Sequence, residues 1–231
     1  MAKTVLLIGG NSGIGLATAR LLRGQGDEVL AAARQAGALE ELGIAVQRFD
    51  ALEPTALVLP ERLDGLVYFP GTIHLRPFHR LTDEDFLRDY RVNCLGAVAA
   101  IQAALPALKA SGAASIVLFS TVAVAQGMPF HASIAAAKGA VEGLTRSLAA
   151  EFAPKIRVNT IAPSLTDTPL AGPLLNSDVK REASAKRHPL QQVGEPEDIA
   201  RLVDFLLSPA SAFMTGQILR PDGGLSSLRL L

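Results

Sequence analysis

Short apolar runs recur along the chain and alternate with longer amphipathic segments. Each run has four to six residues and is continuous in its apolar character, which is typical of parallel strands that are covered on both faces. The runs occupy residues 5–8, 29–33, 45–49, 65–69, 115–119, 157–162 and 217–220. Helical patterns occupy residues 14–23, 83–109, 132–152 and 196–207. The alternation predicts a doubly wound α/β fold, with a seven-stranded parallel sheet and helices on both faces.

Two connections depart from this regular alternation. Residues 50–65 leave little room for a full crossover helix and contain Pro54 and Pro60, so we expect a short or irregular connection. Residues 168–189 hold three prolines and many polar side chains. We interpret them as a mobile loop or short helix near the carboxyl ends of the strands, where ligands bind in such folds. Because no linker, composition break or repeat divides the chain, we expect one domain over residues 1–231.

The composition is that of a folded chain with balanced charge. Of the 231 residues, 49% are apolar and 19% are charged, which excludes a disordered chain. Lys and Arg number 22, as do Asp and Glu, so bulk charge does not support binding to nucleic acid or to an anionic membrane. The longest stretch without these charged residues, 111–137, contains Gly127, Pro129 and several hydroxyls, which do not favour a membrane-spanning helix.

Cysteine and histidine are too scattered for a metal site or a disulfide framework. Cys94 is the only cysteine, and the four histidines have no zinc-binding spacing. His74 and His79 have Pro77 between them and fit a solvated loop better than a pair of ligands. Without a disulfide or a recognisable export signal, we expect a cytoplasmic protein.

A glycine-rich turn connects the first predicted strand to the first predicted helix. Glycines let a backbone turn tightly and approach a phosphate closely, because no Cβ stands in the way. The N-terminus of the next helix adds free N–H groups and the positive end of its dipole. The position of the turn therefore favours a pyrophosphate-binding site over an ordinary connection. The residues of this predicted site are Gly9, Asn11, Ser12, Gly13, Ile14 and Gly15.

The glycine spacing of this turn and several later motifs resemble those of the short-chain dehydrogenase/reductase family. The matching segments are 9–15, 92–96, 157–163, 194–198, 215–217 and 222–224, with Asp50 and Thr168 at single positions. The resemblance covers nearly the whole chain and implies a Rossmann fold that binds a nicotinamide dinucleotide. It implies that Asp50 contacts the adenine and that Thr168 holds the nicotinamide carboxamide. Further cofactor-binding positions that it implies are Ala51, Gly71, Pro163 and Thr166.

The chain departs from this family pattern at several positions near the expected cofactor. Ser164 stands where glycine is usual, and Ile8 where threonine is usual. Residues 68–71 read Tyr-Phe-Pro-Gly instead of the typical Asn-Asn-Ala-Gly. Since those asparagines brace the sheet in the family, we expect aromatic packing to substitute for them here.

The end of the second predicted strand indicates which dinucleotide is bound. A carboxylate at this place would accept hydrogen bonds from a ribose 2′-hydroxyl and repel a 2′-phosphate. Here Ala33 ends the strand and Arg34 follows it, and a guanidinium can bind a phosphate through two hydrogen bonds. The alternative is a surface arginine without a ligand. We therefore expect NADP(H) in preference to NAD(H), which stays possible.

The tyrosine that carries the family's chemistry is missing. In the family, a lysine lowers the pKa of this tyrosine and holds the nicotinamide ribose, and a serine upstream orients the substrate carbonyl. Lys138 matches that lysine, Thr121 takes the place of the serine, and Asn93 matches the asparagine of the central helix. The tyrosine position holds Ile134, which cannot donate a proton.

Two replacements for the missing acid follow from the sequence. His131 shares a helix face with Ile134 and Lys138 if the helix already includes it, and a histidine suits proton transfer near neutral pH. The alternative for His131 is that it caps or precedes the helix and binds water. A water that Thr121, Lys138 and Asn93 hold together is the second candidate. Cys94 fits a small core residue better than a catalytic thiol.

Two functions from different classes follow from these residues. The first is an NADP(H)-dependent oxidoreductase that moves a hydride between the nicotinamide and a small carbonyl or alcohol substrate, with an altered proton donor. The second is a catalytically silent dinucleotide-binding sensor or scaffold, because a fold alone does not decide function. Retention of Lys138, Asn93, Thr121 and Thr168 favours the enzyme, and Ile134 favours the sensor.

The two longest predicted helices are apolar around more of their surface than one core-facing stripe requires. Small and apolar residues fill much of 96–108 and 135–150. The family resemblance also implies that these helices pair across a two-fold axis. We therefore expect a homo-oligomer, a tetramer or a dimer.

Overall fold

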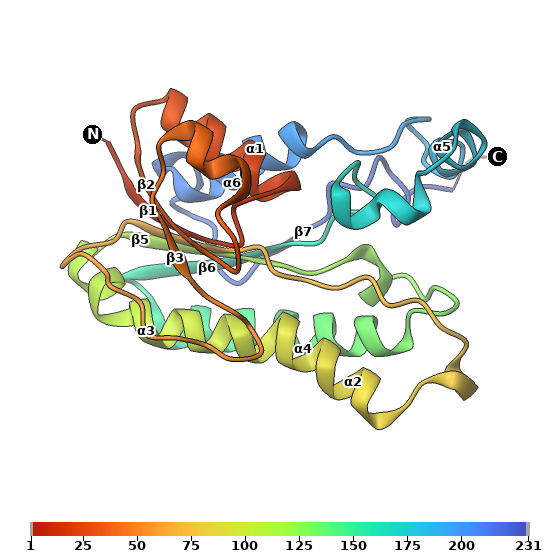
Figure 1. Ribbon diagram of the computed structural model, residues 1–231, viewed down its shortest axis with the longest axis horizontal. Helices are drawn as coiled ribbons and strands as arrows, with labels where there is room; N and C mark the ends of the chain where they lie inside the picture. Colours follow the sequence, from red (N-terminus) through yellow and green to blue (C-terminus); the bar gives the residue numbers. More distant parts are fainter. Residues whose placement is uncertain (1, 230–231) are drawn as a thin grey trace.

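A computed structural model describes residues 2–229, in which seven parallel strands form one sheet with the order β3-β2-β1-β4-β5-β6-β7 (Figure 1). Every neighbouring pair of strands is parallel. The strands are β1 (Thr4–Ile8), β2 (Glu28–Ala33), β3 (Val46–Arg48), β4 (Gly65–Tyr68), β5 (Ala114–Phe119), β6 (Ile156–Ile161) and β7 (Ile218–Leu219). This sheet confirms the predicted doubly wound fold. Residues 1 and 230–231 of the predicted domain lie outside the described residues.

Strand β1 illustrates why continuous apolar runs form this sheet. Leu6 and Ile8 lie in the hydrophobic core beneath one face, while Val5 and Leu7 lie in the core above the other. All four side chains are fully buried. Because successive side chains of a strand alternate between the two faces, a strand that helices cover on both sides needs apolar residues at every position.

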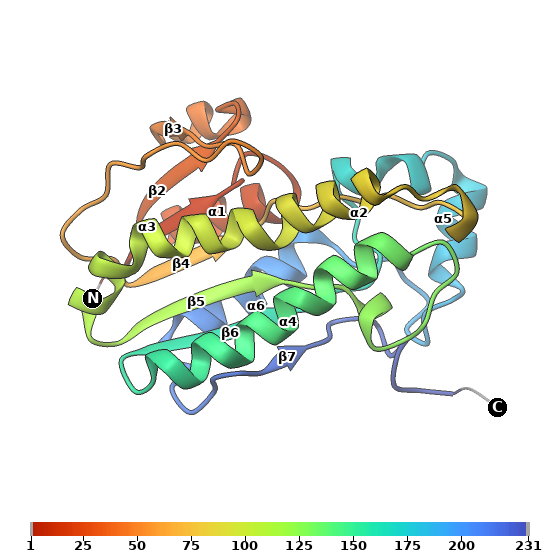
Figure 2. The ribbon, with the colours of Figure 1, turned by 90° about the horizontal axis from the view of Figure 1, so that it is seen from below.

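Helices cover both faces of the sheet. Helix α1 (Gly13–Gly24) packs against α6 (Pro196–Leu207) on one face. Helices α3 (Gly96–Ser111) and α4 (Ala132–Phe152) lie on the other face (Figure 1). Seen from that side, α3 and α4 run along the strands, and α2 (Asp83–Tyr90) continues the line of α3 (Figure 2).

The helix of α2 and α3 is continuous over Asp83–Ser111. A π-helical segment, Arg91–Leu95, joins the two parts. By length and composition this helix could cross a membrane. In the structure it is a core helix, because Ala97 and Ala104 are fully buried in the cluster under the sheet.

The π-helical segment meets the sheet through Tyr68, at the end of β4. The Tyr68 hydroxyl donates a hydrogen bond of 2.6 Å to the carbonyl oxygen of Val92, inside the π-helical turn. The side chain is only 2% exposed, and burial raises the pKa of its hydroxyl, which therefore keeps its proton. The expectation of aromatic packing at residues 68–71 was thus incomplete, since the bracing also includes a hydrogen bond.

Most predicted elements form within one or two residues of their expected ends. Residues 50–65 contain no helix, as expected. The predicted strands at 45–49 and 217–220 are shorter than expected, because only part of each run pairs with a neighbour. Residues 168–189 form a 3₁₀ turn, Pro169–Leu174, and a short helix α5, Asp178–Ala185. The π-helical segment was not predicted from the sequence.

We predict that Tyr68→Phe lowers the free energy of unfolding by about 1 kcal/mol, because it removes the hydrogen bond that the buried Tyr68 hydroxyl donates to the Val92 carbonyl. Urea titration followed by circular dichroism measures this loss. The matched control is Tyr90→Phe, since Tyr90 is 39% exposed on α2 and should change stability little. An equal loss in both variants would contradict the assigned role of the Tyr68 hydroxyl.

Candidate functional site

A cleft of about 1810 Å³ lies at the carboxyl ends of the strands. It is lined by the segments that follow β1, β2, β3, β4, β5 and β6. All the site residues expected from the sequence line this cleft except Asn93, which is buried behind it. The expected residues that line it are Gly9, Asn11, Ser12, Gly13, Ile14, Gly15, Arg34, Asp50, Ala51, Gly71, Thr121, His131, Lys138, Pro163, Thr166 and Thr168.

The glycine-rich turn between β1 and α1 has the geometry of an anion site. Gly9 has a φ of +77°, and a Cβ there would lie 2.9 Å from the Cδ of Pro70. A Cβ on Gly15 would lie 2.8 Å from the Cα of Gly10. Ser12 precedes α1 in an extended conformation and makes no capping bond with its side chain. The first turn of α1 therefore keeps its N–H groups free for a phosphate.

The next two strand ends form the adjacent part of the cleft. Arg34 follows β2, is exposed, and has no ion pair or hydrogen bond from its side chain to any described residue. Asp50 follows β3, where its Oδ1 accepts a bond of 2.9 Å from the N–H of Leu52. The last residue of β2 is Ala33, so the strand end carries no carboxylate. This part of the cleft therefore offers a guanidinium that has no partner among the described residues, and no carboxylate at the end of β2.

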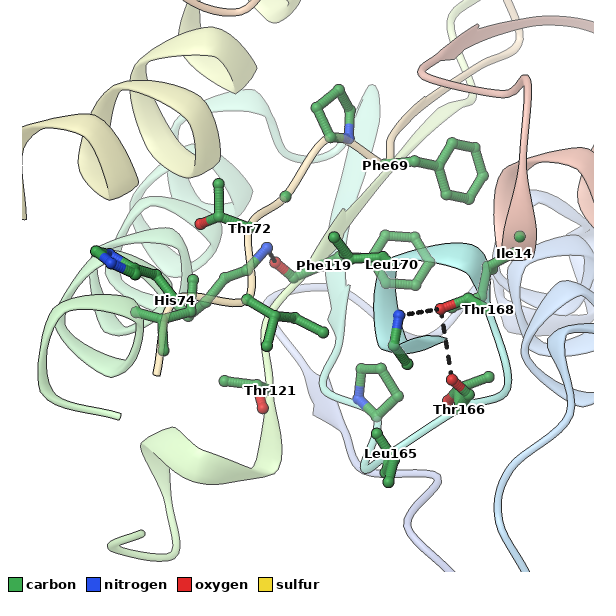
Figure 3. Close-up of a pocket in the computed structure, with 18 of the residues that line it drawn as sticks. Ile14, Phe69, Thr72, His74, Phe119, Thr121, Leu165, Thr166, Thr168 and Leu170 are labelled. Carbon is green, nitrogen blue, oxygen red and sulfur yellow. Dashed lines mark hydrogen bonds between the residues drawn. The ribbon is translucent and has the colours of Figure 1, made fainter. Parts of the chain in front are cut away.

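Lys138 lies at the centre of the cleft, on α4. Its Nζ donates a hydrogen bond of 2.9 Å to the carbonyl oxygen of Phe119 at the end of β5 (Figure 3). A Cβ on Gly71 would lie 3.4 Å from this Nζ and 3.2 Å from the Oδ1 of Asn93. Burial lowers the pKa of Lys138 to about 8, against the opposing influence of the Asp89 carboxylate. The ammonium is therefore charged at neutral pH and close to titration.

Thr121 and Ile134 occupy the positions at which the family pattern has serine and tyrosine. Thr121 begins a 3₁₀ turn, and its Oγ1 accepts a bond of 3.3 Å from the N–H of Ala123, so its hydroxyl proton stays available. The neighbouring Ser120 instead donates to the buried Glu142 at 2.8 Å. Ile134 lines the cleft, and its side chain has no acidic proton to donate.

His131 does not belong to the first turn of α4. The helix begins at Ala132, and His131 is its N-cap residue, with no capping bond from its side chain. Its Nδ1 lies 2.7 Å from the carbonyl oxygen of Pro129, so Nδ1 donates. The condition for a shared helix face with Ile134 and Lys138 is therefore not met, although His131 does line the cleft.

The loop after β6 closes one side of the cleft. Thr168 caps the 3₁₀ turn by accepting a bond of 3.3 Å from the N–H of Ala171, and it donates to the Thr166 carbonyl at 3.4 Å (Figure 3). Gly13 is close enough that a Cβ there would lie 3.0 Å from the Cγ2 of Thr168. This loop therefore contacts the glycine-rich turn directly.

Ser164, which stands where the family pattern has glycine, is bound to a buried histidine. His188 is 2% exposed, and its Nδ1 lies 2.9 Å from the carbonyl oxygen of Ser184. A carbonyl only accepts, so Nδ1 carries the proton. His188 Nε2 therefore accepts from the Ser164 hydroxyl, at 2.9 Å. This pair could not be predicted from the sequence, because the two residues meet only in the fold.

Thr72, His74 and Asp89 are cleft residues that sequence reasoning missed. His74 does lie in a loop after β4, but its ring is flanked by two carboxylates instead of open solvent. Asp89 stands one helical turn before Asn93, and this spacing places the two side chains on one face of the helix. This four-residue spacing was the signal in the sequence from which Asp89 could have been identified. Among the described residues no group of three metal-ligating side chains is present.

The strand order reverses at β1, which lies between β2 and β4, and the glycine-rich turn follows β1 at this switch point. Ligands of open parallel sheets bind outside the strand ends at such a point. The sheet, the turn and the cleft together define a Rossmann-fold protein of the dinucleotide-binding class.

Comparisons with known proteins define the family within this class. A family profile described as "Enoyl-(Acyl carrier protein) reductase" matches residues 8–226. A tropinone reductase homolog of Arabidopsis thaliana is 32% identical, over 97% of this chain and 91% of that protein. A short-chain type dehydrogenase/reductase from Mycobacterium ulcerans superposes with a TM-score of 0.90 at 30% identity, over 98% of this chain and 90% of that chain.

A further solved structure, ElxO with NADP bound, has a TM-score of 0.87 and 26% identity, over 99% of this chain and 100% of that chain. The chain belongs to the short-chain dehydrogenase/reductase family, whose members are oxidoreductases that use NAD(H) or NADP(H).

We predict that NADPH binding weakens as the pH rises through about 8, because Lys138 then loses the positive charge that attracts the dinucleotide. The 2′-phosphate of NADPH, with a second pKa of about 6, is mostly ionised at pH 7 and gains only a little negative charge above it, which would strengthen and not weaken its attraction to cations. Fluorescence titration at pH 7 and pH 9 measures the two dissociation constants. Lys138→Met should bind more weakly and show no such change. A wild-type affinity that is equal at both pH values would contradict the prediction.

Proposed function

We propose that the protein is an NADP(H)-dependent oxidoreductase that moves a hydride between the nicotinamide and a small carbonyl or alcohol substrate. The observation that carries the proposal is one cleft that joins the free N-terminus of α1, the unpaired Arg34 and the buried ammonium of Lys138. The cleft also leaves open space beside this ammonium, lined by Thr121 and Ile134, and a protein that only had to bind a dinucleotide would not need such a space for a substrate.

The residues of the cleft divide between binding and chemistry. When bound, the cofactor supplies or accepts a hydride at its nicotinamide ring. Lys138 donates to the ribose hydroxyls, and Thr121 orients the substrate oxygen through its free hydroxyl proton. Asn93 keeps the wall behind Gly71 in place, since its Nδ2 donates to Thr72 at 2.9 Å and to the Asp89 carbonyl at 2.8 Å. A group other than residue 134 supplies the proton.

NADP(H) is the cofactor that Arg34 favours. Its guanidinium has no protein partner among the described residues, and it lines the cleft beside Ala33, where a carboxylate would repel a 2′-phosphate. The similarity to ElxO, which has been solved with NADP bound, supports the same choice. NAD(H) is the alternative.

The second candidate function is a dinucleotide-binding sensor or scaffold, and Ile134 is the observation that favours it. Spectroscopic turnover of NADPH with a panel of ketones, aldehydes and quinones separates the two. Oxidation of NADPH with at least one carbonyl supports the enzyme. Tight binding of NADPH without turnover of any member of the panel supports the sensor and overturns the proposed function.

We predict that Arg34→Ala raises the dissociation constant for NADPH about 10- to 100-fold, the loss expected for one charge-assisted contact. The affinity for NADH should stay the same, because NADH has no 2′-phosphate. Isothermal titration calorimetry with both dinucleotides measures this difference. Arg20→Ala, an exposed arginine of α1 outside the cleft, is the matched control. Equal affinity of the wild type for NADPH and NADH would refute the role of Arg34.

We also propose that the chain forms a dimer or tetramer through the outer faces of α3 and α4. Ala103 and Pro106 on α3, and Ala136 and Gly143 on α4, are exposed and small, so a second copy can approach these helices closely. Leu144 is partly buried between this surface and the core. A two-fold arrangement would cover such a surface with an identical one.

We predict that light scattering at micromolar concentration gives two or four times the mass of one chain. Ala103→Arg should shift the protein towards smaller species, because the long charged side chain would be forced into the contact. Ala113→Arg, in the exposed turn after α3, should leave the mass unchanged. A monomer mass for the wild type would end this proposal.

A further inference from the structure

A chain of hydrogen bonds links Asn93, Thr72 and Asp89 beside Lys138. The Thr72 hydroxyl donates to Oδ1 of Asp89 at 2.7 Å, and its oxygen accepts from Nδ2 of Asn93 at 2.9 Å. Asp89 is 1% exposed, and its negative charge acts on the ammonium of Lys138. Asp89 is therefore a buried carboxylate in a fixed position next to the reacting end of the cleft.

One oxygen of this carboxylate has no hydrogen-bond donor. Oδ2 of Asp89 is buried, and no described residue bonds to it. A buried carboxylate oxygen without a donor is costly, and in native proteins such a group calls for an explanation. The nearest ring nitrogen is Nδ1 of His74, which lies 4.0 Å away. A shift of about 1 Å would bring the two atoms to an ordinary hydrogen-bond distance.

His74 lies between the buried carboxylate and the cleft. Its side chain is 28% exposed and lines the cleft together with Thr72, Ile134 and Lys138. Figure 3 shows His74 and Thr72 on the same stretch of chain after β4. Nε2 of His74 lies 3.6 Å from Oδ1 of Asp85, which is beyond a normal hydrogen bond, so this nitrogen is open to another acceptor.

The second carboxylate has other partners. Asp85 accepts bonds of 3.0 Å from both the N–H and the hydroxyl of Thr82, as part of the cap of α2, and Arg76 lies 3.6 Å from it. The hydrogen bond from the Thr82 N–H lowers the pKa of Asp85, with His74 and Arg76 adding to the effect. These partners all contact Oδ2, so Asp85 stays an anion of the cap while its Oδ1 faces Nε2 of His74. Asp89 is the carboxylate at the other ring nitrogen, Nδ1.

We propose that His74 donates the proton that Ile134 cannot supply, and that Asp89 is its positioning residue. This inference rests on the proposed function. In carbonyl reduction the hydride adds to the carbonyl carbon, and the π electrons of the C=O bond move to the oxygen. The Nε2–H bond of His74 then breaks and an O–H bond forms on the product alcohol. The neutral imidazole regains a proton from water at the open side of the cleft.

The roles proposed for His74 and Asp89 are those that the two residues have in other histidine–aspartate pairs. A buried carboxylate at one ring nitrogen fixes the tautomer and stabilises the imidazolium, which leaves the other nitrogen to exchange a proton with the substrate. His131 lacks such a partner, because its Nδ1 donates to a backbone carbonyl and no carboxylate of the described residues lies within 4.0 Å of its ring. The charged groups around His74 are Asp85, Asp89, Arg76 and, beyond Asp89, Lys138.

The test compares single alanine variants of two histidines from the same loop region. With the best carbonyl of the panel, His74→Ala should lower kcat about 10²- to 10⁴-fold and leave the dissociation constant for NADPH unchanged. Added imidazole should restore part of the lost turnover, because it can enter the vacated space and donate a proton. His79→Ala is the matched control, since His79 is exposed and outside the cleft, and it should behave as the wild type with or without imidazole.

A second set of variants distinguishes chemistry from folding. Asp89→Asn should lower kcat measured at saturating NADPH, the concentration being set by a parallel binding titration because the change also removes the counter-charge of Lys138. Placing a phenol at the family position with Ile134→Tyr should restore turnover in both the His74→Ala and the Asp89→Asn backgrounds, because the phenol is an independent donor. A purely structural role for His74 or Asp89 predicts no such restoration.

The outcomes separate this inference from the proposed function. Wild-type turnover that is unaffected by His74→Ala, or lost in His131→Ala while kept in His74→Ala, overturns the role of His74 and leaves the oxidoreductase intact. Loss in His74→Ala that neither imidazole nor Ile134→Tyr repairs also overturns it. A wild type that binds NADPH and reduces no carbonyl overturns the proposed function, and the inference falls with it.

Discussion

The buried positive charge of Lys138 is the constraint on which the rest of the cleft depends. Lys138 is only 7% exposed, so water solvates its ammonium poorly and the fold must supply acceptors and counter-charges. The carbonyl of Phe119 provides the acceptor at 2.9 Å, and the buried carboxylate of Asp89 provides the opposite charge. Gly71 lets the chain after β4 pass directly beside the ammonium, because a side chain there would meet it. Four segments of the chain are thereby held in place around one charge: α2, α4, the end of β5 and the stretch after β4.

The fold could be predicted almost completely, because its signals are local. Each strand of a sheet that is covered on both faces must be apolar at every position, and the runs around Val5 and Val117 show this directly in the sequence. The glycine-rich turn is likewise a local signal, since a strand, a turn and a helix follow one another along the chain. Strand ends were less certain, because the length of β7 depends on how far its partner β6 extends.

Site residues could be predicted where a local sequence motif identifies them. They could not be predicted where the site forms between two segments that are distant in the sequence. Lys138 and Thr121 could be placed from motif spacing, and both line the cleft. His74 could not, because only the fold brings Asp89 of α2 to within 4.0 Å of its ring. Ser164 and His188 form a hydrogen bond across 24 positions for the same reason. For His131 the sequence left two alternatives open, because the exact start of a helix decides which face a residue joins. The structure has the second alternative, since His131 is the N-cap residue that precedes α4.

The contact between Gly13 and Thr168 has a kinetic consequence. The glycine-rich turn and the loop after β6 approach so closely that a Cβ on Gly13 would lie 3.0 Å from the Cγ2 of Thr168, and both segments line the cleft. For an oxidoreductase that binds its dinucleotide between these two segments, entry and release would each require the loop to move. The rate of that loop movement would then set an upper limit on how fast successive turnovers can follow one another.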